Sequence, residues 1–134
     1  MKSTRDKIRV LVIDSPSKDI KDVYDIFNKE GLTVFYSNDS DDALKKCNEI
    51  YPHLLIIEVL SEPMNGLEIV RHIKKDSDFK NISIIMCSNR DDRFDKSWAK
   101  EQGVDIYLVK PINKDIIIKA AKKILKSKTK KRRG

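Results

Sequence analysis

The polar side chains best suited to binding or catalysis in this chain lie at the ends of short apolar runs. In chain order they are Asp14, Ser15, Glu58, Ser88, Asn89 and Lys110. A carboxylate such as Glu58, which interrupts an apolar run, is costly to bury unless it is paired. Lys110 is its natural partner, because a lysine stem can lie on apolar surface while the amine reaches an acid. These residue types therefore indicate an acidic pocket that is countered by one amine.

Other kinds of reactive site find little support. Cys47 and Cys87 are far apart and lack a CxxC partner, and His53 and His72 lack metal-ligand spacing. His72 is also not expected to lie near Ser15 and Ser88, so no hydrolytic triad is predicted. We expect no enzymatic activity. The cysteine usage and the charged N-terminus, which does not resemble a signal peptide, favour a cytoplasmic protein. No apolar run approaches the ~20 residues that a membrane span needs.

Five apolar runs, each followed by a longer amphipathic stretch, must position the polar residues. The predicted strands are Ile8–Ile13, Leu32–Tyr36, Leu54–Val59, Ile82–Cys87 and Val104–Val109. The predicted helices run from Ser15-Pro16 to Gly31, from 38–40 to about Ile50, from Leu67 to about Lys75, from the loop after Ser88 to about Gln102, and from the Asn113 cap through Leu125. We expect a loop that contains Pro63 and Gly66 before the third helix.

Strands that alternate with helices predict an α/β fold with one doubly wound, five-stranded parallel sheet and five flanking helices. Ligands of such sheets bind at the carboxyl ends of the strands. All six polar residues follow or end a predicted strand, so we expect them at that one edge.

The net charge of +7 is concentrated at the C-terminus. Eight of the 28 basic residues lie from Lys122 onward, whereas all 21 acidic residues precede it, so the rest of the chain is close to neutral. We therefore divide the chain into a domain over 1–126 and a basic tail over 127–134, which we expect to be disordered.

The sequence resembles the response-regulator receiver domain over roughly residues 7–126. The likeness lies in VLVID at 10–14, MNG at 64–66, Ser88, Gln102-Gly103 and YLVKP at 107–111. The stretch 95–103 is also similar to single-domain regulators associated with type IV pilus twitching motility. The spacings from Glu58 to Ser88 and from Ser88 to Lys110 are those of typical receivers.

The resemblance implies a flavodoxin/CheY-like fold with strand order 2-1-3-4-5. It also implies a role for each site position. Asp14, Ser15 and Glu58 fall on the acidic pocket that holds Mg²⁺ in the family, and Glu58 falls on the phosphoacceptor. Ser88, Asn89 and Lys110 fall on the phosphate site, and Ser88 and Tyr107 on the switch pair. The bond between Lys110 and Pro111 is expected to be cis.

Several positions depart from the family pattern. Ser15 replaces the second acid and Glu58 replaces the aspartate phosphoacceptor. Glu62 stands at a usual proline and Asn89 at a usual alanine. Mg²⁺ wants oxygen ligands in near-ideal octahedral geometry, and phosphoryl transfer depends on positioning. We therefore predict a degenerate receiver, or pseudo-receiver, with weak Mg²⁺ binding at Asp14 and Glu58 or none, and no other cofactor.

Three functions remain open at this stage. The leading one is a protein-interaction module in two-component (phosphorelay) signalling, in which Glu58 either imitates phosphoaspartate and locks one state or only pairs with Lys110. The second is a working phosphoacceptor acted on by a histidine kinase. The third is nucleic-acid binding through the basic tail. It is disfavoured because the tail has no aromatic residues between its basic ones.

The resemblance also implies where a protein partner would bind. In the family, the fourth helix, fifth strand and fifth helix form the usual face for a kinase or a downstream effector. Phe94 and Trp98 lie one helical turn apart on the fourth helix. We expect at least one of them in the core, and Trp98, if exposed, is a candidate anchor.

Overall fold

The computed structural model describes residues 7–13, 25–37, 39–59 and 63–133. Within these ranges the strands are β1 (Arg9–Ile13), β2 (Thr33–Ser37), β3 (Leu54–Val59), β4 (Ser83–Ser88) and β5 (Ile106–Val109). The labelled helices are α2 (Ser40–Ile50), α3 (Pro63–Lys75), α4 (Arg93–Gln102) and α5 (Lys114–Arg133). Residues 25–29 add a helical segment before β2.

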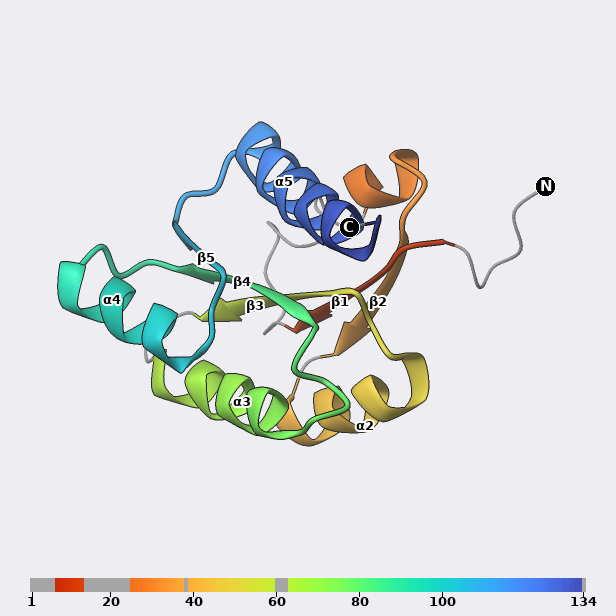
Figure 1. The fold of residues 1–134 in the computed structure, drawn as a ribbon. Coiled ribbons are helices and arrows are strands. Elements are labelled where there is room, and N and C mark those ends of the chain that lie inside the picture. Colours follow the sequence, from red (N-terminus) through yellow and green to blue (C-terminus); the bar gives the residue numbers. More distant parts are fainter. Residues whose placement is uncertain (1–6, 14–24, 38, 60–62, 134) are drawn as a thin grey trace.

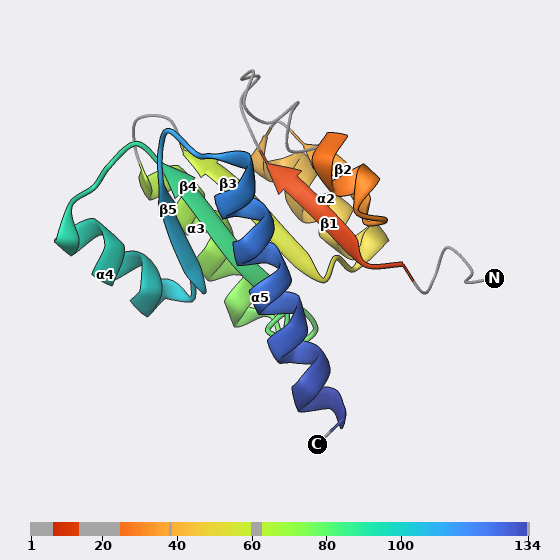
Figure 2. The same cartoon turned by 90° about the horizontal axis from the view of Figure 1, so that it is seen from above.

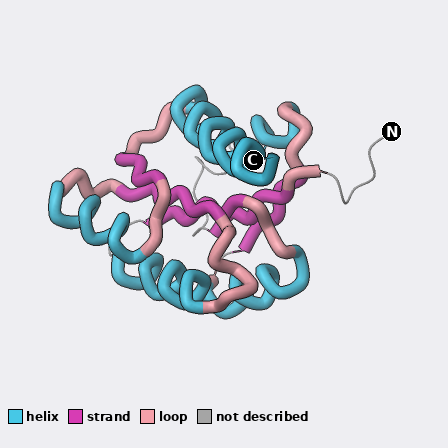
Figure 3. The backbone as a smooth tube through the Cα atoms, in the orientation of Figure 1, coloured by secondary structure: helices cyan, strands magenta, loops and turns pink. Residues whose placement is uncertain are grey.

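The five strands form one parallel sheet in the order β2-β1-β3-β4-β5. Helices α2, α3 and α4 cover one face of the sheet, and α5 and the helical segment 25–29 cover the other (Figure 1). The tube in Figure 3 makes the same three layers visible, with the strands between two layers of helix. The predicted doubly wound α/β fold and its strand order are confirmed.

The central strands are apolar on both sides because both faces of the sheet are covered. In β3, Leu55 and Ile57 belong to the core under α2, α3 and α4. Leu54 and Ile56 belong to the core under α5. All four side chains are at most 1% exposed. A continuous apolar run, rather than an alternating one, is therefore what this strand requires.

Helix α3 begins earlier than the sequence suggested. It starts at Pro63, so Gly66 lies inside the helix and not in the expected loop. Proline suits the first turn of a helix, where its missing N–H has no intrahelical partner. The glycine signal for a loop was overridden because the apolar face of α3, which includes Leu67 and Ile73, packs on the sheet.

Helix α5 also differs from expectation. It continues to Arg133, so the backbone of residues 127–133 is helical where we predicted disorder. No glycine or proline interrupts this segment, and lysine and arginine are good helix formers that are favoured near a helix C-terminus. The helix projects beyond the sheet (Figure 2). The division of the chain at residue 126 stays a prediction.

The two aromatic residues of α4 have different environments. Trp98 packs against the core, and the Arg71 guanidinium lies 5.5 Å from the centre of its ring. Phe94, in contrast, is 73% exposed. The structure therefore packs Trp98 against the core, as expected for at least one of the two, and leaves Phe94 as the exposed aromatic residue.

The cysteines are core residues, as expected. Cys47 and Cys87 are 0% and 3% exposed. Burial raises the pKa of the Cys47 thiol to about 11, which makes it an inert apolar group at neutral pH. In the described part of the chain, no helix has the length and apolar character needed to cross a bilayer.

Two glycines end helices in the left-handed conformation. Gly31 has a φ of 84° and Gly103 a φ of 118°, and the Gly103 N–H caps α4 through the carbonyls of Ala99 and Lys100. A Cβ at Gly103 would lie 2.6 Å from Cγ of Lys74, whereas a Cβ at Gly31 would meet nothing within 4 Å. Only Gly103 is therefore required for both its conformation and its close packing.

We predict that Gly103→Ala destabilises the protein more than Gly31→Ala does. Each substitution carries the cost of a left-handed alanine, about 1–2 kcal/mol, and Gly103→Ala adds the clash with Lys74. Urea unfolding measures both values. In a Lys74→Ala background the difference between the two glycine variants should narrow. Equal costs in the wild-type background would contradict this account of the helix end.

Candidate functional site

The carboxyl ends of β3, β4 and β5 meet at one edge of the sheet. In the register, Glu58 lies beside Cys87 and Val59 beside Ser88. Ser88 in turn lies beside Val109. Lys110 follows directly, and its backbone N–H donates to the Ser88 carbonyl at 2.7 Å. The peptide bond between Lys110 and Pro111 is cis, as predicted.

Glu58 and Lys110 form an ion pair at this edge, between Oε1 and Nζ. Their strands are not neighbours, because β4 lies between β3 and β5. Two strand spacings separate them by about 10 Å, so the two side chains meet over the end of β4. The Glu58 side chain is 2% exposed and that of Lys110 is 13% exposed. The pair expected from the sequence is therefore present, and it is buried.

Ser88 and Tyr107 both contact the backbone of one residue, Arg90. The Ser88 hydroxyl, which is fully buried, accepts a hydrogen bond of 3.1 Å from the Arg90 N–H. The Tyr107 hydroxyl donates a hydrogen bond of 2.9 Å to the Arg90 carbonyl. The two predicted switch residues are thus brought together through the loop that follows β4.

The Arg90 side chain connects this loop to helix α4. Its Nε donates to Oδ2 of Asp95 at 3.0 Å. The hydrogen bond and charge of Asp95 raise the pKa of the Arg90 guanidinium. Sequence reasoning missed Arg90, because its backbone rather than its side chain makes the contacts with Ser88 and Tyr107. No residue-type signal could have marked it.

The remaining predicted site residues lie outside the described ranges or at the surface. Asp14, Ser15 and Glu62 lie outside the described residues. Asn89 is exposed just beyond β4. Within the described ranges, no three His, Cys, Asp or Glu side chains gather as a metal site. The structure thus brings together Glu58 and Lys110 as a pair, and Ser88 and Tyr107 around Arg90.

The surroundings of Glu58 bear on the chemistry that its carboxylate can perform. An attacking carboxylate needs an exposed oxygen that can approach a donor in line. Glu58 is almost wholly buried, and Oε1 is already in contact with the Lys110 amine. Breaking this pair would leave a charge in a poorly solvated site, which is unfavourable. The described part of the edge is therefore arranged as a paired polar pocket.

Comparison with known proteins gives the same kind of domain. The sequence pattern of the response regulator receiver domain matches residues 10–122. Protein PilG of Pseudomonas aeruginosa is 30% identical over 122 residues, which are 91% of this chain and 90% of that protein. Protein PilH of the same organism is 24% identical over 117 residues, which are 87% of this chain and 97% of that protein.

Solved structures agree with the fold. The chemotaxis response regulator CheY4 of Vibrio cholerae superposes with a TM-score of 0.78 at 27% identity, over 88% of this chain and 98% of that one. A response regulator from Desulfuromonas acetoxidans gives a TM-score of 0.79 at 20% identity, over 89% of this chain and 97% of that one. At that identity the second likeness concerns the fold alone. With the strand order, the matched residues and these relatives together, the chain belongs to the response regulator receiver domain family and is a CheY-like receiver of two-component signalling.

Proposed function

We propose that this receiver acts mainly as a protein-interaction module, with little or no phosphotransfer of its own. The observation that carries the proposal is the buried ion pair of Glu58 and Lys110. The family uses these two positions to accept and neutralise a phosphoryl group. Here the two side chains neutralise each other. The pocket therefore holds a fixed pair of charges without a phosphoryl group from a donor.

The donor set of the pocket also fits Mg²⁺ poorly. Of the positions that hold Mg²⁺ in the family, the sequence keeps carboxylates at Asp14 and Glu58, whereas Ser15 supplies a neutral hydroxyl. One oxygen of Glu58 contacts an ammonium group, which competes with a cation for the same charge. Mg²⁺ holds few protein ligands, but it demands near-ideal geometry from them. We therefore expect weak Mg²⁺ binding or none.

The contacts around Arg90 favour a pocket that fixes one conformation of the loop between β4 and α4. Tyr107 holds the carbonyl of Arg90 and Ser88 holds its N–H. The Arg90 side chain then reaches Asp95 on α4. A permanent carboxylate at Glu58 would keep the neighbouring strand ends in one arrangement, whereas phosphorylation would switch them. This is the stronger form of the proposal, and simple pairing of Glu58 with Lys110 is its weaker form.

The partner surface we propose is formed by α4, β5 and α5. Phe94 on α4 is 73% exposed and Ile116 on α5 is 48% exposed. Exposed large apolar side chains of this kind are typical anchors for a protein partner, here a histidine kinase or a downstream effector. The buried thiols Cys47 and Cys87 suit a reducing compartment, and so a cytoplasmic location.

A second candidate function is a working phosphoacceptor. It is favoured by the position of Glu58, which occupies the third-strand site of the family, and by Lys110 beside it. A kinase would have to displace the Lys110 amine from Glu58 before a phosphoryl group could approach. The two functions differ in whether Glu58 ever carries phosphate, which can be measured directly.

We predict that the wild-type protein gains no phosphoryl adduct when it is incubated with acetyl phosphate and Mg²⁺. The double variant Ser15→Asp/Glu58→Asp should gain one. It shortens the acceptor by a methylene and restores the second acid, and a misplacement of ~1 Å can cost on the order of 100-fold in rate. Intact-mass spectrometry over time measures the adduct in both proteins.

The control is Ser15→Asp/Glu58→Ala, which restores the second acid but removes the acceptor. It should show no adduct, which assigns any adduct of the double variant to position 58. A wild-type adduct that disappears in Glu58→Ala would overturn the interaction-only function and support the phosphoacceptor.

We also predict that Lys110→Met destabilises the fold by roughly 3–5 kcal/mol, because it leaves the buried Glu58 carboxylate without its ammonium partner. The double variant Glu58→Leu/Lys110→Met should recover most of that loss, since it removes both charges. Urea unfolding of Lys110→Met, Glu58→Leu and the double variant gives the coupling energy between the two residues. If the losses of unfolding free energy in the two single variants simply added up in the double variant, the two residues would not act as a structural pair.

A further inference from the structure

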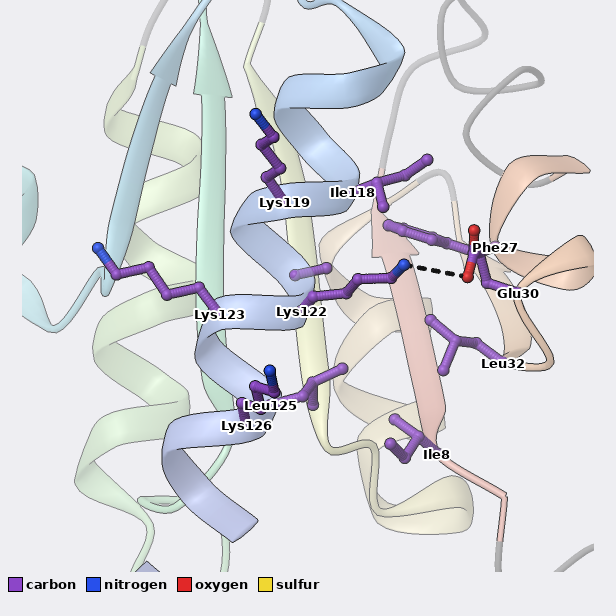
Figure 4. A pocket seen from close by; sticks show the side chains of 11 residues that line it. Ile8, Phe27, Glu30, Leu32, Ile118, Lys119, Lys122, Lys123, Leu125 and Lys126 are labelled. Carbon is purple, nitrogen blue, oxygen red and sulfur yellow. Dashed lines mark ion pairs between the residues drawn. The ribbon is translucent and has the colours of Figure 1, made fainter. Parts of the chain in front are cut away.

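A groove lies between α5 and the elements that precede β2, on the face opposite α2, α3 and α4. It has a volume of about 580 Å³, which is within the range of binding sites for ligands. Its floor includes Ile8, Leu32, Ile118 and Leu125, all half-buried. Figure 4 shows these aliphatic side chains directed toward one another from the residues just before β1 and β2 and from α5. The groove is therefore apolar at its base and partly open to water.

Lysines form one wall of the groove. Four of them line it, at positions 119, 122, 123 and 126 of α5. This spacing of i, i+3, i+4 and i+7 makes a continuous stripe along a helix, about 10 Å long at 1.5 Å per residue. All four side chains are exposed. The helix carries no acidic residue after Asp115, so the wall presents one sign of charge.

Among the described residues, one acid lines the groove from the other side. Glu30 pairs with Lys122 at 3.2 Å, and Figure 4 shows Lys122 reaching across the groove toward it. Lys119 and Lys123 extend in other directions from α5, away from Glu30. In the described part of the groove, Glu30 thus pairs with one of the four lysines, and the wall retains a positive excess.

From this combination we propose that the groove binds an amphipathic helix of a partner protein, with an apolar stripe flanked by aspartate or glutamate. The apolar stripe would cover Ile8, Leu32 and Ile118. The flanking acids, repeated at helical spacing, would lie against the lysines of α5, which repeat with the same period. Charge complementarity along one wall fixes the direction and rotation of the helix.

The floor favours a peptide over a nucleic acid. Bases bind by stacking on exposed aromatic rings, combined with contacts to phosphates. The aromatic residue of the groove, Phe27, is 1% exposed, so it offers no ring face to a base. Aliphatic side chains suit an apolar helix face instead.

This surface is separate from the pocket at the strand ends. The groove uses Ile8, which precedes β1, and Lys126, which lies in the C-terminal half of α5, whereas Glu58 and Lys110 lie at the carboxyl ends of β3 and β5. It is also separate from the exposed Phe94 on α4. The proposal therefore goes beyond the function proposed above and does not depend on whether Glu58 accepts phosphate.

The test uses the full chain and a fluorescein-labelled synthetic helix with leucines at i, i+3, i+4 and i+7 and glutamates on the flanking positions. Fluorescence anisotropy should show saturable binding that weakens between about 0.05 and 0.5 M salt. Lys119→Glu/Lys126→Glu should weaken binding by about tenfold, because two attractive contacts become repulsive. Ile118→Ser, which exposes a polar group in the floor, should weaken it as well.

The matched control is Lys45→Glu/Lys80→Glu, which makes the same change in net charge at an exposed lysine of α2 and an exposed lysine of the turn after α3. It should bind the peptide as the wild type does. Equal losses in both double variants, or equal binding of a sequence-scrambled peptide, would reduce the effect to net charge and overturn the proposal. Tighter binding of a labelled single-stranded oligonucleotide, lost in Lys119→Glu/Lys126→Glu, would overturn it in favour of nucleic acid. Thermal unfolding by circular dichroism verifies that each variant is folded.

Discussion

The buried ion pair between Glu58 and Lys110 is the interaction on which the account of the site depends. It joins two strands that do not touch, so it exists only if β4 lies between them and all three strands keep their register. Both charges have left water, and each is tolerated because the other is present. The apolar strands are packed on both faces, and this packing fixes the positions of the strand ends at which the two side chains meet.

A second set of contacts links the strand ends to helix α4. Ser88 and Tyr107 hold the N–H and the carbonyl of Arg90, and the Arg90 guanidinium holds Asp95. The β4–α4 loop is therefore fixed from two strands and one helix at once. Because Lys110 donates its own N–H to the Ser88 carbonyl, the ion pair and the loop share one strand end.

Most of the fold could be predicted from the sequence, because continuous apolar runs and helical spacing report burial directly. The partnership of Glu58 with Lys110 followed from the cost of burying a lone carboxylate. Local signals failed where tertiary packing or helix propensity prevailed over them. Gly66 suggested a loop but lies within α3, and the basic end of the chain continues α5. The role of Arg90 could not be predicted, since backbone groups make its contacts and every residue has those.

The most direct test of the central claim is a crystal structure grown with Mg²⁺ and beryllofluoride, a mimic of a phosphoryl group bound to a carboxylate. The account predicts that Glu58 remains paired with Lys110 and that neither beryllium nor magnesium is found at the strand ends. A beryllofluoride group bonded to Glu58, with a well-coordinated Mg²⁺ ion between it and Asp14, would contradict it.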